Sequence, residues 1–254
     1  MKKYSVLTFN VGGYEIIHEI PKEAINQEIE YIYVTDDETI KSDTWTIVYE
    51  HNLQGSIFDK RMQIRYNPFK YVSTNVVMKI DGSIKIEKDL YPIFQKFDEG
   101  GYDCAVCVHP QRNTMFEEYA AWCELRNYPR EHSEKVLKCM EELGYDIYTY
   151  KGLYQTNFAI QRNDFFNNLW NKIHYCMSKM LATPPDTIER ADQTINSFIL
   201  NRFFDDRNVM VVTSPQIYNG EYLNFCNHRG DEPFILPQHI EPYAFNEPVN
   251  LIDI

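Results

Sequence analysis

The sequence predicts an α/β domain with a largely parallel central sheet, and three observations lead to this class. Segments rich in β-branched and aromatic residues alternate along the chain with segments of helical spacing. The chain has 254 residues, of which 44% are hydrophobic, which suits one large domain or two small ones with buried cores. No internal repeat, low-complexity block or Gly/Ser-rich linker divides it. In such sheets ligands bind at the carboxyl ends of the strands, so the loops that follow the strands are where a site is expected.

The first 110 residues contain most of the predicted strands. Each is a short run of aliphatic, β-branched and aromatic residues: Tyr4–Phe9, Tyr31–Val34, Trp45–Tyr49, Tyr71–Ile80 and Tyr102–Val108, with a further β-type run at Ile84–Ile86. A helix is predicted at Ile57–Tyr66, where apolar residues recur at helical spacing and Pro68 ends the element. A shorter helix is predicted at Asp89–Phe97.

The remainder of the chain is more helical. Helical spacing predicts four helices: Thr114–Arg126, Ser133–Leu143 with Gly144 as its stop, a helix capped by Asn163 or Asp164 that runs to about Met180, and Arg190–Phe204. Strand-type runs stand between them at Tyr145–Tyr150, Tyr154–Ile160 and Val209–Val212. Prolines at positions 233, 237, 242 and 248 indicate an irregular C-terminal arm that wraps the body of the domain.

The charge balance excludes some functions. Lys and Arg number 25 against 37 Asp and Glu, a net charge of −12, which disfavours nonspecific nucleic-acid binding because that needs a basic surface. A small phosphate-bearing ligand needs only a local basic pocket and stays possible. No run of about 18 apolar residues predicts a membrane span, and residues 1–10 are interpreted as a first strand rather than a signal peptide. We therefore expect a cytoplasmic protein without a transmembrane segment; the sequence does not indicate its oligomeric state.

Six cysteines are interpreted as free core thiols in a reducing cytoplasm. Cys104 and Cys107 form the single C-x-x-C, and no second pair lies at zinc-site spacing. On a strand, residues three apart face opposite sides of the sheet. These two thiols are therefore not expected to meet.

The loops after the first two strands could approach a ligand. Phe9, Asn10 and Val11 lead into Gly12-Gly13, a pair that lets a ligand come close to the backbone, although a plain tight turn explains it equally well. The loop from Phe9 to Gly13 is neither a dinucleotide-binding fingerprint nor a P-loop. Asp36 ends the next strand, where a carboxylate could accept hydrogen bonds from a base or a ribose. An Asx-turn or a helix cap is the simpler explanation of Asp36 alone.

Asp81-Gly82-Ser83 follows the strand that ends at Ile80. A carboxylate followed two positions later by a hydroxyl suits a hard divalent cation, which also bridges phosphates. The alternative is a β-hairpin, because Asp-Gly between two β-type runs is a strong hairpin signal. Considered alone, the hairpin is the better explanation.

Charged residues elsewhere could complete a site. Lys60, Arg61 and Arg65 cluster on one predicted helix, as a diphosphate clamp or as a solvated face. Asp192 and Gln193 open a later helix, where the carboxylate either complements the helix dipole or points into a cleft. His109 follows a strand directly and is either a site residue or, more commonly for a single histidine, a structural one.

Taken in order, these segments carry a resemblance. They are a strand ending in aspartate (31–36), a tryptophan strand (45–48), a basic helix (60–65), a strand ending in Asp-Gly (80–84), His109-Pro110-Gln111-Arg112 with Glu117 and Glu118, and Asp192-Gln193. This set resembles nucleotide-sugar glycosyltransferases of the GT-A fold over roughly residues 4–212. It is most similar to a family formerly of unknown function that includes plant probable hexosyltransferases and bacterial and viral relatives.

The resemblance implies a fold and a set of roles. The fold is a single Rossmann-like domain over residues 1–254 with a mixed, mostly parallel sheet flanked by helices: a nucleotide-binding half (1–110), an acceptor half (111–212) and a C-terminal arm (213–254). Phe9, Asn10, Val11 and Asp36 would hold the nucleoside, Arg61 and Arg65 the diphosphate, and Gln193 the donor. Asp192 would contact the donor sugar or the acceptor hydroxyl, as general base in inverting enzymes, and His109 would line the acceptor side. The cofactor would be Mn²⁺ or Mg²⁺ held by Asp81, Ser83 and a late histidine, His228 or His239.

The implied reaction is sugar transfer from a nucleotide diphosphate sugar, such as a UDP-sugar, to a glycan, polysaccharide or glycoconjugate. Ser83 stands where the family keeps a second aspartate, so the cation would be held by Asp81 with phosphates and water, or weakly. A noncatalytic nucleotide-sugar or carbohydrate-binding module on the same fold is the alternative. A metal-dependent phosphohydrolase would need further clustered carboxylates, which the sequence does not supply. The short motifs do not distinguish inverting from retaining transfer.

Overall fold

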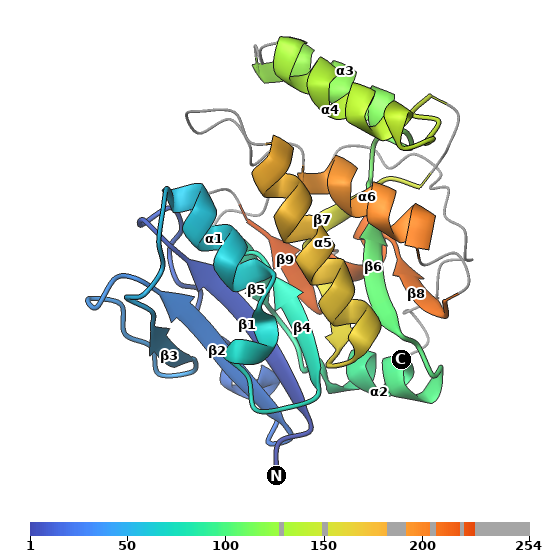
Figure 1. The fold of residues 1–254 in the computed structure, drawn as a ribbon. Helices are drawn as coiled ribbons and strands as arrows, with labels where there is room; N and C mark the ends of the chain where they lie inside the picture. Colours follow the sequence, from blue (N-terminus) through green and yellow to red (C-terminus); the bar gives the residue numbers. More distant parts are fainter. Residues whose placement is uncertain (127–129, 149–151, 182–191, 204–206, 219–220, 227–254) are drawn as a thin grey trace.

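A central sheet runs through the computed structural model, with helices against both of its faces (Figure 1). The structure describes residues 1–126, 130–148, 152–181, 192–203, 207–218 and 221–226. The seven strands of the sheet are β1 (Tyr4–Asn10), β2 (Ile29–Thr35), β3 (Thr46–Tyr49), β4 (Val76–Ile80), β6 (Cys104–Val108), β7 (Tyr154–Arg162) and β8 (Val209–Val212). Their order is β3-β2-β1-β4-β7-β6-β8. Neighbours are parallel except where β7 pairs with β4 and β6, so the predicted mixed, mostly parallel α/β sheet is confirmed.

The helices cover the two faces unequally. The described helices are α1 (Ile57–Arg65), α2 (Tyr91–Glu99), α3 (Met115–Arg126), α4 (Arg130–Glu142), α5 (Phe165–Leu181), α6 (Asp192–Phe203) and the short α7 (Ser214–Ile217). Single 3₁₀ turns stand at Lys22–Ala24 and Pro68–Lys70. Helices α1, α5 and α6 pack on one face and α2 on the other, while α3 and α4 stand together beyond the end of β6 (Figure 1). The division into a nucleotide-binding and an acceptor half stays a prediction.

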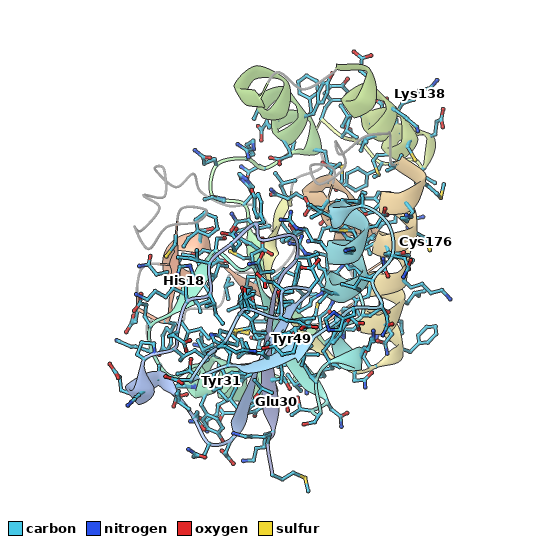
Figure 2. All side chains as sticks on the ribbon, turned by 90° about the vertical axis from the view of Figure 1, so that its left-hand side faces the viewer. His18, Glu30, Tyr31, Tyr49, Lys138 and Cys176 are labelled. Carbon is cyan, nitrogen blue, oxygen red and sulfur yellow. The ribbon has the colours of Figure 1, made fainter. Side chains whose placement is uncertain are left out.

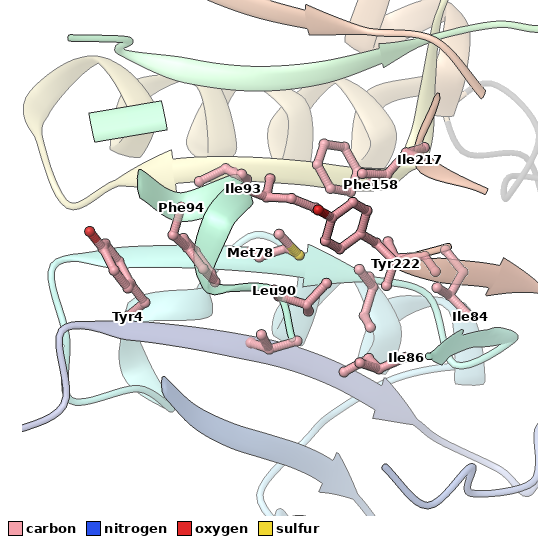
Figure 3. Packing of buried hydrophobic residues seen from close by; sticks show 14 of the residues in the cluster. Tyr4, Met78, Ile84, Ile86, Leu90, Ile93, Phe94, Phe158, Ile217 and Tyr222 are labelled. Carbon is pink, nitrogen blue, oxygen red and sulfur yellow. The ribbon is translucent and has the colours of Figure 1, made fainter. Parts of the chain in front are cut away.

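Alternation along the strands builds a core on each side of the sheet. On β4, Met78 packs against the α2 side, whereas its neighbour Val77 joins the cluster that contains Ile64 of α1. Phe94 of α2 and Phe158 of β7 are fully buried in the first cluster, as Figure 3 shows. Both faces of the sheet are therefore apolar, as a sheet covered by helices on both sides requires.

Two predicted strands differ from the structure. β4 begins at Val76 rather than Tyr71, because Ser73 bonds through its amide and hydroxyl to Glu30 and Thr74 bonds to the carbonyl of Val76. Such side-chain bonds offer the backbone an alternative to a ladder. The strand expected at Tyr145–Tyr150 is absent over the described residues 145–148, where the Tyr148 amide donates to Asp146 in a turn. Positions 149 and 150 lie outside the described residues.

The hairpin alternative for Asp81-Gly82 is wrong. The Ile84 amide does donate to the Asp81 carbonyl at 3.0 Å, so the chain turns there. However, β5 (Ile84–Ile86) leaves the sheet and pairs antiparallel with β9 (Leu223–Phe225) instead of returning along β4. The first part of the predicted arm is therefore ordered as α7 and β9, while its four prolines lie outside the described residues.

Other local predictions are confirmed. Gly144 ends α4 with φ +77°, and the amides of Gly144 and Tyr145 bond to the carbonyls of Glu141 and Met140, a Schellman stop. Asp164 caps α5 by accepting from the Asn167 amide at 2.8 Å.

The cysteine interpretation holds with one correction. Cys104 and Cys107 are buried and free in clusters on opposite faces of the sheet, as predicted. Cys139 is half-buried and Cys226 is buried, but Cys176 is exposed on α5, so it is not a core thiol (Figure 2). The side chain of Cys123 lies outside the described part of the chain. Within that part, each helix is too short or too polar to cross a bilayer.

Candidate active site

A cleft of about 400 Å³ lies at the carboxyl edge of the sheet, where the strand order changes direction. β2 and β4 flank β1 on its two sides, and the crevice outside such a switch point is where α/β sheets bind ligands. Because β7 is antiparallel, its beginning reaches the same edge, and the Asp81 amide donates to the Asn157 carbonyl at 3.1 Å. The lining residues are Phe9, Asn10, Tyr14, Glu15, Arg61, Met62, Arg65, Asp81, Gly82, Ser83, Gln155, Thr156, Asn157, Asp192, Gln193 and Phe225.

Arg65 joins two carboxylates in this cleft. It is the last residue of α1, and its guanidinium donates through Nη2 to Asp81 Oδ1 at 2.5 Å and through Nη1 to Asp192 Oδ2 at 2.8 Å. Thr156 at the start of β7 donates to the same Asp192 oxygen at 2.8 Å. The Arg65 side chain is only 14% exposed, which strengthens these charge-assisted bonds relative to a surface pair. The end of α1 and the starts of β7 and α6, which are distant in sequence, therefore meet in the cleft.

A buried polar network contacts the backbone carbonyls of Arg65 and Asp192. His174 of α5 lies with Nε2 at 2.9 Å from the Asp192 carbonyl and 3.0 Å from the Tyr66 hydroxyl. Burial lowers the pKa of His174 to about 3, so its ring is neutral, and Nε2 carries the proton because a carbonyl oxygen only accepts. Lys79 of β4 donates to the Arg65 carbonyl at 3.4 Å. Burial, and next the charge of Arg65, lowers the pKa of Lys79 to about 7.

The side chain of Asn10 shapes the loop after β1. Its oxygen accepts from the amides of Tyr14 and Glu15 at 3.0 and 3.1 Å, and its nitrogen donates to the Glu15 carbonyl. Gly12 has φ +72°, and a Cβ there would lie 2.8 Å from Ile57, so the turn requires glycine. The loop presents the Tyr14 ring to the guanidinium of Arg61, whose carbon lies 4.2 Å from the ring centroid.

Most residues proposed from the sequence meet in the cleft. Its lining includes eight of them: Phe9, Asn10, Arg61, Arg65, Asp81, Ser83, Asp192 and Gln193. Val11 is instead fully buried in the core beside α1. Asp36 lies beside the cleft loop, where it accepts from the Gly12 amide at 3.0 Å and pairs with Lys60 at 3.4 Å. His228 and His239 lie outside the described residues.

His109 is not part of the cleft lining. Its Nδ1 accepts from the amides of Gln111 and Arg112, and its Nε2 lies 2.9 Å from the Arg112 guanidinium. Burial and the charge of Arg112 lower the pKa of His109 to about 3. Arg112 also pairs with the buried carboxylate of Glu118. This geometry supports the structural alternative for His109, as the residue that folds the loop into α3.

The sequence assigned no individual role to several lining residues, although the segment 152–157 and the C-terminal arm were expected to set the shape of the pocket. Gln155, Thr156 and Asn157 form a polar run at the beginning of a predicted strand, a place that faces this edge only because β7 is antiparallel. Tyr14 and Glu15 lie just beyond the loop that had been singled out. Phe225 enters from β9, whose pairing with β5 is long-range. The polar run at 155–157 is a signal that indicates these three residues. The sequence does not indicate the direction of the strand.

The described residues fit a divalent cation only together with a phosphate ligand. No group of three or more His, Cys, Asp or Glu side chains among them could hold an ion. The cleft does offer the carboxylates of Asp81 and Asp192, and Mg²⁺ is commonly held by one or two carboxylates plus substrate phosphates. The lining carries the acids Glu15, Asp81 and Asp192 against the bases Arg61 and Arg65, so a diphosphate placed there needs additional positive charge.

Comparison with known proteins identifies a distant structural likeness. No family model matches the chain, and no curated protein matches it. Among solved structures, the apo form of mouse xyloside xylosyltransferase 1 is similar with a TM-score of 0.47 at 10% sequence identity, over 84% of this chain and 86% of that chain. A likeness at that level carries no argument about the site, so the functional proposal rests on the geometry of the cleft and on the sequence motifs. Membership of the plant hexosyltransferase family stays a prediction.

Proposed function

We propose that this chain is a glycosyltransferase that moves a sugar from a nucleotide diphosphate sugar to a hydroxyl group of a glycan, polysaccharide or glycoconjugate. One observation carries the proposal: Arg65 meets Asp81 and Asp192 at the switch point of the sheet. A cationic fork beside two carboxylates offers both groups that the reaction needs, a partner for a departing diphosphate and a proton acceptor.

The donor would lie along the loop after β1 and the last turns of α1. Phe9 and Asn10, which line the cleft, would contact the nucleoside, with Asp36 beside them, and the cleft residues Arg61 and Arg65 would contact the diphosphate. As the bond between sugar and phosphate breaks, negative charge grows on the diphosphate, and fixed guanidinium groups stabilise that charge more in the transition state than in the ground state. A bound Mn²⁺ or Mg²⁺, held by Asp81 and Ser83 with the phosphates, would add Lewis-acid stabilisation of the same charge.

Asp192 is the candidate proton acceptor. Its Oδ2 accepts from Arg65 and Thr156, and its Oδ1 accepts from the Gln193 amide at 2.8 Å. These bonds fix the direction of the carboxylate, which a general base needs to meet the acceptor hydroxyl. In an inverting reaction, Asp192 would take the proton of that hydroxyl as the oxygen attacks the sugar.

Calorimetric titration with UDP- and GDP-sugars, with and without Mn²⁺, tests the proposal. We expect one donor to bind, and the Arg61→Gln variant to bind it at least about tenfold more weakly because one charged contact to phosphate is lost. Assays for transfer and donor hydrolysis follow. Binding without either reaction over hours would favour the noncatalytic module, whereas no binding of any donor would overturn the proposal.

A further inference from the structure

Arg65 occupies the carboxylates to which a divalent cation would bind. Its two terminal nitrogens contact Asp81 and Asp192 at 2.5 and 2.8 Å, so the positive charge of the guanidinium already lies between them. A cation that binds Asp81 must separate this carboxylate from Arg65, which breaks a charge-assisted bond in a partly buried site. The exchange costs Arg65 one of its two carboxylate contacts, which disfavours cation binding in the absence of another ligand.

A diphosphate changes this balance. Arginine matches phosphate oxygens as well as it matches carboxylates, so the diphosphate offers the guanidinium a new partner within the same cleft. The added negative charge also raises the attraction of the cleft for a divalent ion, because its lining residues are net acidic. Phosphate oxygens then supply the ligands that the described side chains lack.

Hydrogen bonds hold the backbone of Arg65 in place. Its long side chain can still adopt other torsions. Lys79 donates to the Arg65 carbonyl, and His174 donates to the Asp192 carbonyl. The Phe9 ring lies under the guanidinium, with its centroid 5.6 Å from the Arg65 carbon, and lines the same cleft. An exchange of partners therefore requires new side-chain torsions of Arg65 and no movement of the helix.

We propose that Arg65 competes with the divalent cation for Asp81 and thereby makes cation binding depend on the donor diphosphate, an inference that rests on the proposed function. Coupling of this kind is reciprocal: the cation tightens diphosphate binding by the same factor by which the diphosphate tightens cation binding.

Mn²⁺ binding, followed by the electron paramagnetic resonance signal of the free ion, tests the inference on the full chain. For the wild type we expect at least about tenfold tighter Mn²⁺ binding with UDP than without it, the size of one charge-assisted bond. The Arg65→Gln variant is expected to bind Mn²⁺ alone about tenfold more tightly than the wild type, and UDP should then increase its Mn²⁺ affinity by a smaller factor.

Three variants control the measurement. Arg162→Gln is the matched control, because it removes an arginine that pairs with Asp98 and does not line the cleft, and its affinity for Mn²⁺ alone should stay at the wild-type value. Asp81→Asn should lose Mn²⁺ binding with and without UDP. Arg65→Lys keeps the charge without the fork and should lie between wild type and Arg65→Gln, which provides a second reading if the glutamine variant does not fold.

The inference is overturned if UDP binds the wild type but leaves its affinity for Mn²⁺ unchanged, or if Arg65→Gln leaves the affinity for Mn²⁺ alone unchanged. Failure of the proposed function looks different. In that case UDP binds under no condition, while the comparison of wild type with Arg65→Gln in Mn²⁺ alone still decides whether Arg65 competes with the cation.

Discussion

Asp192 is a cleft carboxylate that two separate elements contact. Arg65 of α1 and Thr156 of β7 both contact its Oδ2 at 2.8 Å. If it takes the acceptor proton, Asp192→Asn should lower the transfer rate at saturating donor by about 10²- to 10⁴-fold, the usual contribution of a general base. The asparagine oxygen can still accept from Arg65 and Thr156, while the bond from the Gln193 amide is lost, so the dissociation constant of the donor, measured by calorimetry, should change only a few-fold.

The control for Asp192→Asn is Asp164→Asn. Asp164 precedes α5 as its cap and Asp192 is the first residue of α6, and asparagine caps a helix as well as aspartate does. We expect this variant to transfer sugar at the wild-type rate. A transfer rate that is unchanged in Asp192→Asn would remove Asp192 from the role of base.

Lys79 gives the stability of the protein a predictable pH dependence. Its pKa is about 7 in the fold, lowered first by burial and next by Arg65, against 10.5 as the ordinary value. Between those pH values the unfolded chain binds more protons than the folded chain, so this group makes the fold more stable as pH rises from 7 toward 10.5. Below pH 7 the charged Lys79 lowers the stability of the fold by its full amount.

A Lys79→Met variant isolates this contribution. We expect it to be more stable than the wild type at pH 7, with the difference shrinking toward pH 10 by up to about 1.4 kcal/mol per pH unit. Urea unfolding of both proteins at pH 7, 8 and 9 measures the difference, from which the titrations common to both cancel. A pH-independent difference would contradict a buried, low-pKa lysine.

At the residue scale, the sequence predicts those site residues whose position follows from one strand end or one helix. Asp81 follows β4 directly, so the carboxyl-edge rule made it a candidate, whereas Arg65 was selected from the basic cluster on α1. Thr156 escapes the same rule, because it begins a strand and faces the cleft only through the antiparallel direction of β7. His109 obeys the rule and yet serves its own loop, since burial beside Arg112 keeps it away from the cleft.

At the element scale, α1 carries both cleft arginines, and its first turn fixes where they point. Ser56 and Asp59 form a capping box: the Asp59 amide donates to Ser56 Oγ at 3.2 Å, and the Ser56 amide donates to Asp59 Oδ2 at 3.0 Å. Ser56→Ala should lower the free energy of unfolding, measured in urea, by about 1 kcal/mol, because one helix amide loses its acceptor.

Ser56→Asp provides the matched comparison, since an aspartate at the cap accepts from the same amide. It should retain most of the stability that alanine loses, although Asp59 lies close by and its negative charge offsets part of the gain. Equal losses in both variants would show that the cap does not stabilise α1.

The type of a helix or turn was predictable where it depends on neighbouring residues. The distant segment with which an element pairs was not predictable. The Schellman stop at Gly144 and the cap at Asp164 depend on neighbouring residues, and both were predicted. The Asp81-Gly82 turn also exists, but the partner of β5 comes from residues 223–225, which no hairpin rule can select. Likewise, Tyr145 and Ile147 are buried like strand residues while their backbone turns.

At the scale of the whole molecule, strand order brings the functional groups together. Arg65 and Asp192 are 127 positions apart and meet because α1 and α6 lie over the same face and reach the same edge of the sheet. The alternation of strands and helices predicts the α/β class, but it contains no information on which strands are neighbours. The net charge of −12 is equally uninformative about the cleft, where two arginines face three acids.

The core on both faces of the sheet predicts which substitutions lower the stability of the whole molecule. Phe158 of β7 is fully buried on the α2 face of the sheet (Figure 3), whereas Phe165 at the start of α5 is 71% exposed. Phe158→Ala should lower the free energy of unfolding by about 3–5 kcal/mol, because a buried ring is lost and the sheet beside it cannot collapse into the cavity. Phe165→Ala should change it by no more than about 0.5 kcal/mol.

Urea unfolding of both variants measures this contrast, with the denaturant slope as a check that the unfolding transition stays the same. Phe158 directly follows Thr156 and Asn157, so its loss should also loosen the edge that holds Asp192 and weaken donor binding even where the variant is fully folded. Phe165→Ala should bind donor like the wild type. If the two variants lost equal stability, the central sheet would not be the core that holds the cleft in place.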